Sequence, residues 1–184
     1  MALLKADGAT GDRLYLDAAQ KAAEALVHGQ LKSGGWTQVI HFAKPERGQL
    51  GDYRFGRPAG DWNMSSLDDG QTQSALKFLV LADQALANRN EKIHEAARFG
   101  LLAAQFPNGA FPQGWRVPNP QPEVMKAKYP TYDWRTEGRI KNYWDYYTLN
   151  DNLAGDVADT LITAHQVYGD DATLKSLERL GDFL

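Results

Sequence analysis

An internal repeat limits the folds that this chain can adopt. The segment QLKSGGWTQ at 30–38 recurs as QFPNGAFPQ at 105–113, which is 75 residues further on. Both copies have glutamine at each end, glycine at the fifth position and an aromatic residue at the seventh. A second resemblance links the Gly-Asp pair at 11–12 to the one at 169–170. A repeat of this length predicts a fold built from similar units that stack on one another.

Apolar residues recur at helical spacing between these repeated segments. The segment 71–87 is apolar nearly all round and 152–168 is apolar over a broad face, which predicts buried helices. The segments 13–31 and 91–105 are amphipathic, which predicts helices with one face in water. The full set of predicted helices is 1–8, 13–31, 71–87, 91–105, 152–168 and 172–184.

The alternation of buried and amphipathic helices predicts an all-α fold of the α/α-toroid type, in which an inner ring of parallel helices lies within an outer ring. An open helical solenoid of the TPR type is the alternative, but the repeat of 75–80 residues is too long for it. The chain starts within a predicted inner helix and stops at Leu184 without a capping signal. We therefore expect residues 1–184 to form one incomplete toroid domain, truncated on its C-terminal side.

Composition excludes several classes of function. No stretch approaches the roughly 20 apolar residues of a membrane-spanning helix, so we expect no membrane partner. The net charge of −3 does not support nucleic-acid binding. Cysteine is absent, which excludes thiolate metal sites and makes Ca²⁺ or Mg²⁺ on oxygen ligands the metals to expect. The N-terminus lacks the hydrophobic core of a signal peptide. We also expect the chain to be a monomer.

Two long loops, 39–67 and 106–149, lead into the two predicted inner helices and are followed by acidic residues. Inner helices of a toroid point the same way, so their N-termini meet at one end of the ring. The acidic residues should therefore converge there and form an oxygen-rich set that suits Ca²⁺. The predicted metal ligands are Asp68, Asp69 and Asp151, with Asn150 or Asn152 beside them.

The same residues have a simpler interpretation as helix caps. Asp and Asn are common N-caps, and the helix dipole favours negative charge at a helix start. The doublet at 68–69 and the triplet at 150–152 contain more polar side chains than a cap requires. Capping and cation binding therefore both stay open for these residues.

The second loop is rich in basic and aromatic residues. The stretch 116–142 has six Lys and Arg residues against three acidic ones, and 129–147 has seven of the twenty aromatic residues. Aromatic rings can stack on sugars and basic groups pair with carboxylates, which predicts a groove for an acidic polysaccharide. An alternative of equal weight is that the rings only anchor the loop by packing. The predicted substrate-binding residues are Arg135, Arg139, Lys141, Trp144, Tyr146 and Asn152.

Four segments resemble the family 10 polysaccharide lyases, also called the pectic acid lyase family, in the family's order. LDDGQT resembles the family's Asp-Asn-Gly-Ala-Thr segment, and AAQFPNGAFPQ resembles its Gln-Tyr-Pro-Asn-Gly-Gly-Trp-Pro-Gln segment. TLNDN is similar to its Thr-Phe-Asn-Asp-Asn segment. Asp69 stands where the family often has asparagine, which adds a negative charge. The resembling segments are 30–42, 67–79, 103–113 and 147–156.

The resemblance implies Ca²⁺-dependent β-elimination of polygalacturonate by a secreted or periplasmic pectate lyase with an α/α toroid. Asp68 and Asp151 match acidic residues that bind calcium or face the substrate in that family. The family's catalytic base is an arginine from the C-terminal portion of the module, which we expect beyond Leu184. One alternative is an inverting glycoside hydrolase using Asp68 or Asp69 with Asp151, about 6.5–9.5 Å apart. Another is a non-catalytic fragment that binds acidic polysaccharide.

Overall fold

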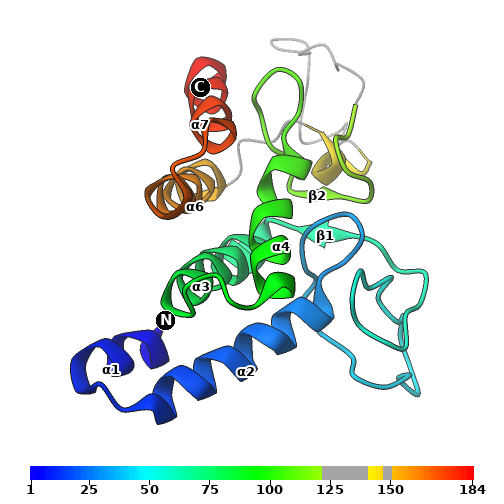
Figure 1. The fold of residues 1–184 in the computed structure, drawn as a ribbon. Helices are drawn as coiled ribbons and strands as arrows, with labels where there is room; N and C mark the ends of the chain where they lie inside the picture. The colour runs from blue at the N-terminus through cyan, green and yellow to red at the C-terminus, as the bar shows by residue number, and fades with distance from the viewer. Residues whose placement is uncertain (122–140, 147–150) are drawn as a thin grey trace.

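The computed structural model describes residues 1–121, 141–146 and 151–184, and these are predominantly helical (Figure 1). Short 3₁₀ turns η1 (Asp68–Gly70), η2 (Leu101–Ala104) and η3 (Tyr143–Asp145) accompany two short strands, β1 (Ser65–Ser66) and β2 (Gly114–Trp115). The predicted all-α class is therefore confirmed. The α-helices are α1 (Ala2–Thr10), α2 (Arg13–Gly29), α3 (Gln71–Ala85), α4 (Glu91–Phe99), α6 (Leu153–Tyr168) and α7 (Asp171–Phe183).

The predicted helices are all present, and most of their ends lie within two residues of the predicted ones. The exception is the segment 91–105, in which the α-helix ends at Phe99 and the 3₁₀ turn η2 follows. Gly100 stands at this break and is buried against α3. A Cβ atom at Gly100 would lie 2.6 Å from Leu76 Cδ1, so close packing at the break requires glycine.

The helices form consecutive hairpins, with α1 against α2, α3 against α4 and α6 against α7 (Figure 1). The first and last hairpins turn in the same way, as the paired Gly-Asp segments predicted. Gly11 (φ 65°) and Gly169 (φ 63°) end α1 and α6 in the left-handed region, which glycine adopts without strain. Asp12 and Asp170 then cap α2 and α7 by accepting backbone N–H bonds from Leu14 and Thr173, each 2.9 Å long.

Burial follows the predicted alternation of inner and outer helices from α2 onwards, but the prediction is wrong for α1, which was expected to be an inner helix and has no buried residue, because it packs mainly against α2 and touches α3 only slightly. Helix α3 is buried over most of its surface and packs against α1, α2, α4 and α6. Helices α2, α4 and α7 each bury only a few residues on one face. The core therefore lies around α3 and the face of α6 that packs against it. The first residues of α3 and α6 lie at the same end of this helix pair.

A two-stranded ribbon, consisting of β1 and β2, joins the two long loops and was not predicted. Ser65 pairs with Trp115 and Ser66 pairs with Gly114, in antiparallel register. The backbone N–H of Leu67 also donates to the carbonyl oxygen of Gln113, at 2.8 Å. The ribbon therefore holds the chain that enters α3 beside the start of the second long loop.

The glutamine that opens each repeated segment makes the same contacts in both copies. In the first copy, Gln30 Nε2 donates to the carbonyl oxygen of Gly34 (3.0 Å) and to that of Ala96 in α4 (3.0 Å). In the second copy, Gln105 Nε2 donates to the equivalent glycine carbonyl (2.9 Å) and to that of Ser176 in α7 (2.8 Å). Each glutamine thus joins its own turn to the outer helix of the next hairpin.

Replacing Gln105 by alanine is expected to lower the free energy of unfolding by roughly 2 kcal/mol, because two buried carbonyl groups lose their donor. The carbonyls of Gly109 and Ser176 accept these bonds at a buried turn, where Gln105 is 5 % exposed. Urea unfolding followed by circular dichroism measures the loss. Gln166→Ala, at an exposed position of α6, is the matched control and should change stability little. Equal effects of the two substitutions would contradict the role of Gln105.

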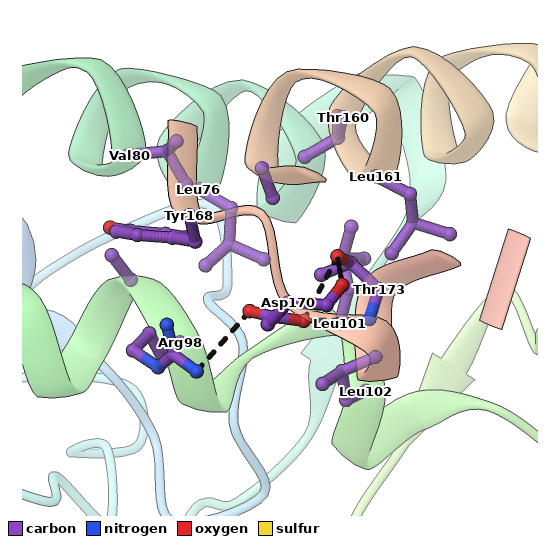
Figure 2. Close-up of a pocket in the computed structure, with 12 residues that line it drawn as sticks. Leu76, Val80, Arg98, Leu101, Leu102, Thr160, Leu161, Tyr168, Asp170 and Thr173 are labelled. Atoms are coloured by element: carbon purple, nitrogen blue, oxygen red, sulfur yellow. Dashed lines mark hydrogen bonds and ion pairs between the residues drawn. The ribbon is translucent and has the colours of Figure 1, made fainter. Parts of the chain in front are cut away.

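A small pocket of about 40 Å³ lies between α3, α4, α6 and α7, and Figure 2 shows its lining. Most of its side chains are apolar, including Leu76, Val80 and Leu161. On one side, Arg98 Nη2 lies 3.2 Å from Asp170 Oδ2 in an ion pair. Partial burial acts to raise the pKa of Asp170, but hydrogen bonds from Thr173 and the charge of Arg98 outweigh it, so the pKa lies below its usual value. The pocket is too small for a sugar and belongs to the core.

A polar cluster around the buried Asp83 continues from this pocket to the C-terminal end of α3. The guanidinium of Arg98 lies 5.0 Å from the ring centre of Tyr168, and the Tyr168 hydroxyl donates to Asp83 Oδ2 at 2.8 Å. The same oxygen lies 2.7 Å from His94 Nδ1. Because Asp83 is fully buried, this cluster fixes α3, α4 and α6 at the end of the fold opposite the starts of α3 and α6.

Stability is expected to fall as the pH rises above about 10, the pKa of an unfolded tyrosine, because Tyr168 stays protonated in the fold. Burial first, and then its hydrogen bond to Asp83, raise the pKa of Tyr168 above its usual value. The unfolded chain then binds fewer protons than the folded one, so the free energy of unfolding decreases with pH. Urea unfolding at several pH values measures this slope. Tyr168→Phe should flatten it and Tyr15→Phe should not; identical slopes for both variants would contradict the assignment.

Candidate functional site

The starts of α3 and α6 enclose a pocket of about 190 Å³, here called the acidic pocket. The turn η1, which precedes α3, packs against α6, so residues 83 positions apart in the sequence lie around one space. The structure thus brings together the three residues predicted as metal ligands, while their role as ligands stays a prediction. The residues that line the pocket are Leu67, Asp68, Asp69, Gly70, Asp151, Asn152, Leu153 and Asp156.

The carboxylates of the acidic pocket are not used as helix caps. Helix α3 begins after Gly70 and α6 after Asn152, and neither helix receives a hydrogen bond from a capping side chain. The outer helices differ, because Asp12, Asn90 and Asp170 each cap one of them through a side-chain oxygen. In the part of the chain that the structure describes, no side-chain hydrogen bond from these acidic residues therefore caps α3 or α6.

Backbone geometry is unusual on both sides of the pocket. Asp69 (φ 49°) and Asp151 (φ 41°) adopt positive φ angles, and Gly70 (φ 69°) follows the first of them. Aspartate tolerates this region better than most residues do, but the conformation is less stable than ordinary helical or extended backbone. An aspartate with positive φ thus stands two residues before each of these helices, although the next residue differs, with φ 69° at Gly70 and −98° at Asn152.

Asp156 is a residue of this site that sequence reasoning missed. It lies in the first turn of α6, where Asn152 Nδ2 donates to its Oδ1 at 3.0 Å. Its Oδ2 would lie 3.9 Å from a Cβ atom at Gly70, which shows how closely α6 approaches η1. The available signal was its position four residues after Asn152, which places both side chains on one face of a helix.

Four aspartates and no basic side chain line the acidic pocket. Within the part of the chain that the structure describes, none of the four forms an ion pair. Their mutual repulsion favours a bound cation, and oxygen donors are what Ca²⁺ prefers. However, across residues 1–121, 141–146 and 151–184, no three His, Cys, Asp or Glu side chains form a group that could hold a metal by itself. A cation in this pocket would need further oxygen ligands from water or from a bound anion.

The predicted substrate-binding residues lie in different parts of the structure. Arg135 and Arg139 lie outside the described residues, and Asn152 lines the acidic pocket. Lys141 is exposed, whereas Trp144 and Tyr146 are partly buried and do not line the acidic pocket. The packing alternative for the aromatic residues therefore stays open beside the predicted sugar contact.

The segment 141–146 lies on the ribbon. Its turn η3 packs against β2, and the Trp144 ring comes close to Gly114, where a Cβ atom would be 3.8 Å from Trp144 Cδ1. Tyr143 meets Trp144 edge-to-face, with 5.4 Å between ring centres. Arg116, which follows β2, donates from Nη1 to both carboxylate oxygens of Asp145, at 2.9 and 3.1 Å. The sequence pattern could not indicate this attachment, because the paired residues are 29 positions apart.

None of the described helices has the length and hydrophobicity that crossing a membrane requires. No protein-family model matches the sequence, and no curated protein is significantly similar to it.

The fold is similar to solved structures of one enzyme. It matches a family 10 polysaccharide lyase from Cellvibrio cellulosa with a TM-score of 0.54 and 19 % sequence identity. A variant of that lyase in complex with trigalacturonic acid matches with the same score and identity. Each match covers 92 % of this chain but only 47 % of the lyase chain, so this chain spans about half the length of the enzyme that it resembles. At this level of identity the likeness establishes a shared fold.

Proposed function

We propose that this chain contributes the acidic part of a pectate lyase site, which cleaves polygalacturonate by Ca²⁺-dependent β-elimination outside the cytoplasm. The acidic pocket is the observation that carries this proposal. Its carboxylates come from the starts of two inner helices and are not consumed by capping. A fold shared with a polysaccharide lyase, one form of which binds trigalacturonic acid, supports the choice of substrate.

The charge of the pocket explains why a cation should be required. A galacturonate carboxylate would be repelled by Asp68, Asp69 and Asp151 unless a positive charge lay between them. When bound, Ca²⁺ would act as a Lewis acid that stabilises the negative charge developing on the substrate carboxylate as the neighbouring C5 proton leaves. The requirement for outside oxygen ligands fits this arrangement, because a uronate carboxylate can provide them.

The residues of this chain would bind and orient the reacting sugar. Carboxylates among Asp68, Asp69 and Asp151, together with oxygens from water or from the uronate, would hold the cation, and the hydrogen bond between Asn152 and Asp156 would fix the first turn of α6 beside it. The proton must be taken from C5 by a base, and the C4–O bond must break as the C4–C5 double bond forms. No arginine lines the acidic pocket, so the group that would take this proton lies elsewhere than among its lining residues.

Binding without cleavage is the second candidate function. The chain spans 47 % of the lyase chain that it resembles, so it can hold the acidic part of a site without the groups that complete it. In that case the chain would bind polygalacturonate in the presence of Ca²⁺ and release it unchanged.

Incubating the chain with polygalacturonate, with Ca²⁺ or with EDTA, tests the proposal. A lyase produces an unsaturated uronate whose double bond absorbs ultraviolet light, and this signal should disappear with EDTA. New reducing ends without that absorbance would indicate a glycoside hydrolase instead. Retention on immobilised polygalacturonate without any product would support the binding function. No product and no retention would reject both.

A further inference from the structure

The peptide group that joins Leu67 to Asp68 is held at both ends by side chains. Gln73 Nε2 donates to the carbonyl oxygen of Leu67 at 2.8 Å, and the backbone N–H of Asp68 donates to Ser66 Oγ at 3.0 Å. Because a peptide group is planar, it cannot turn without breaking one of these two hydrogen bonds. The two side chains, here called the peptide clamp, therefore fix the direction in which the chain enters Asp68.

The backbone fixes the rest of this turn. The N–H of Leu67 donates to the carbonyl oxygen of Gln113 at 2.8 Å, and the N–H of Gln71 donates to that of Asp68. Within residues 1–121, 141–146 and 151–184, no hydrogen bond or ion pair involves the Asp68 carboxylate. The turn is thus held by contacts that do not use this carboxylate.

Asp69 needs such support because its backbone is strained. Its φ of 49° and ψ of 27° lie in the left-handed region, and Gly70 follows with a φ of 69°. A residue other than glycine stays in this region only where the surrounding contacts determine its conformation. The peptide clamp acts on the peptide group directly before Asp68 and so supports the strained residue that comes next. Without the clamp, we expect Asp69 to relax and its carboxylate to move.

Gln73 is a poor choice of residue for stability alone. It is 3 % exposed, and its Oε1 has no hydrogen-bond partner among the residues that the structure describes. A buried acceptor without a partner destabilises the fold, and an apolar side chain of the same length would avoid this cost. What the glutamine provides is the hydrogen bond that it donates to the turn before Asp68.

We propose that Gln73, together with Ser66, is a positioning residue for the cation site, because the peptide clamp holds the turn in which Asp68 and Asp69 line the acidic pocket. This rests on the proposed function, in which these carboxylates bind Ca²⁺. Residues that orient metal ligands commonly change metal affinity by roughly 10- to 100-fold when they are replaced. Loss of the clamp should therefore weaken Ca²⁺ binding more than it weakens the fold.

Gln73→Met is expected to weaken Ca²⁺ binding roughly tenfold, because methionine has the length of glutamine but cannot donate a hydrogen bond. The melting temperature in EDTA should change by less than about 4 °C, since losing the hydrogen bond and removing the unpartnered acceptor have opposite effects. Calorimetric titration of Ca²⁺ into the chain with trigalacturonic acid measures the affinity. The heat of titrating Ca²⁺ into trigalacturonic acid alone is subtracted.

Gln105→Met is the matched control. Gln105 is another buried glutamine that donates to backbone carbonyls, but its partners Gly109 and Ser176 do not line the acidic pocket. This variant should have a lower melting temperature and a Ca²⁺ affinity within about twofold of the wild type, because the two sites are independent. If both glutamine variants lost the same affinity, or if Gln73→Met kept the wild-type affinity, the proposal would be overturned.

Ser66→Ala tests the other end of the peptide clamp and provides an answer even if Gln73→Met does not fold. It removes the acceptor for the Asp68 N–H and should also weaken Ca²⁺ binding. The combined variant should lose less affinity than the product of the two single losses, because both substitutions release the same peptide group. An unchanged affinity in Ser66→Ala, or losses that multiply, would overturn the proposal.

Cleavage assays separate this proposal from the proposed function. If the wild type binds Ca²⁺ but forms no unsaturated product, the lyase assignment fails, and the Ca²⁺ affinities still decide the role of Gln73. If the wild type cleaves polygalacturonate and Gln73→Met binds Ca²⁺ equally well, only the positioning role is rejected. A wild type that binds no Ca²⁺, even with trigalacturonic acid present, would overturn both.

Discussion

Asp151→Asn is expected to reduce the Ca²⁺-dependent rate of polygalacturonate cleavage by roughly 100-fold or more, because it removes one charged oxygen from the proposed cation site. Asparagine has the same size and tolerates the positive φ of this position, so the turn before α6 should persist. Initial rates followed by ultraviolet absorbance measure the loss. If the chain binds without cleaving, affinity for oligogalacturonate in the presence of Ca²⁺ replaces the rate.

Thermal unfolding with and without Ca²⁺ provides the control for this substitution. In EDTA, Asp151→Asn should melt at the wild-type temperature or slightly above it, because one of four neighbouring negative charges is gone. Added Ca²⁺ should raise the melting temperature of the wild type more than that of the variant. Asp171→Asn, an exposed acid in the first turn of α7, should behave like the wild type. A wild-type rate and Ca²⁺ response in Asp151→Asn would remove Asp151 from the site.

Asp83→Ala is expected to lower the free energy of unfolding by roughly 3 kcal/mol, a large share of the stability of a domain this size. Asp83 is fully buried, and its Oδ2 contacts both His94 and Tyr168. Removing the carboxylate leaves both groups without their partner. The loss is smaller than for a perfectly paired charge, because Asp83 Oδ1 has no hydrogen-bond partner among the residues that the structure describes. Urea unfolding measures the change.

Two variants make this result specific. Asp83→Asn keeps an acceptor for one donor and should lose less stability than Asp83→Ala. Asp159→Ala removes the exposed partner of Lys77, in an ion pair that also joins α3 and α6, and should change stability by less than about 1 kcal/mol. If Asp83→Ala and Asp159→Ala lowered the free energy of unfolding equally, the burial of Asp83 would not explain its contribution to stability.

The helical class and the repeated turns could be predicted because they depend on residues near one another in the sequence. Apolar spacing places α3 and α6 inside the fold, and Gly11 and Gly169 supply a conformation that their neighbours require. The repeat also predicted equivalent turns, although not that Gln30 and Gln105 hold them. These glutamines bond to carbonyls of helices more than sixty residues further on, which no local pattern encodes.

The candidate site was predictable only in part. The rule that inner helices point the same way was enough to expect Asp68, Asp69 and Asp151 around one space. Asp156 was missed because its carboxylate reaches the pocket only through the close approach of α6 to η1. The sequence also could not decide whether an aspartate before a helix caps it or leaves its carboxylate free. Asp12 and Asp151 each stand just before a predicted helix, but in the structure only Asp12 accepts a capping hydrogen bond.

By itself, the sequence determined which segments are helices, that α3 and α6 are the most buried of them and which acidic residues precede those two, because propensity and apolar spacing act along the chain. Only the tertiary structure decided that the carboxylates remain uncapped, that Asp156 joins them and that Arg116 holds the Trp144 segment on the ribbon. Those facts depend on contacts between distant residues, and such contacts exist only after the helices and the ribbon have packed.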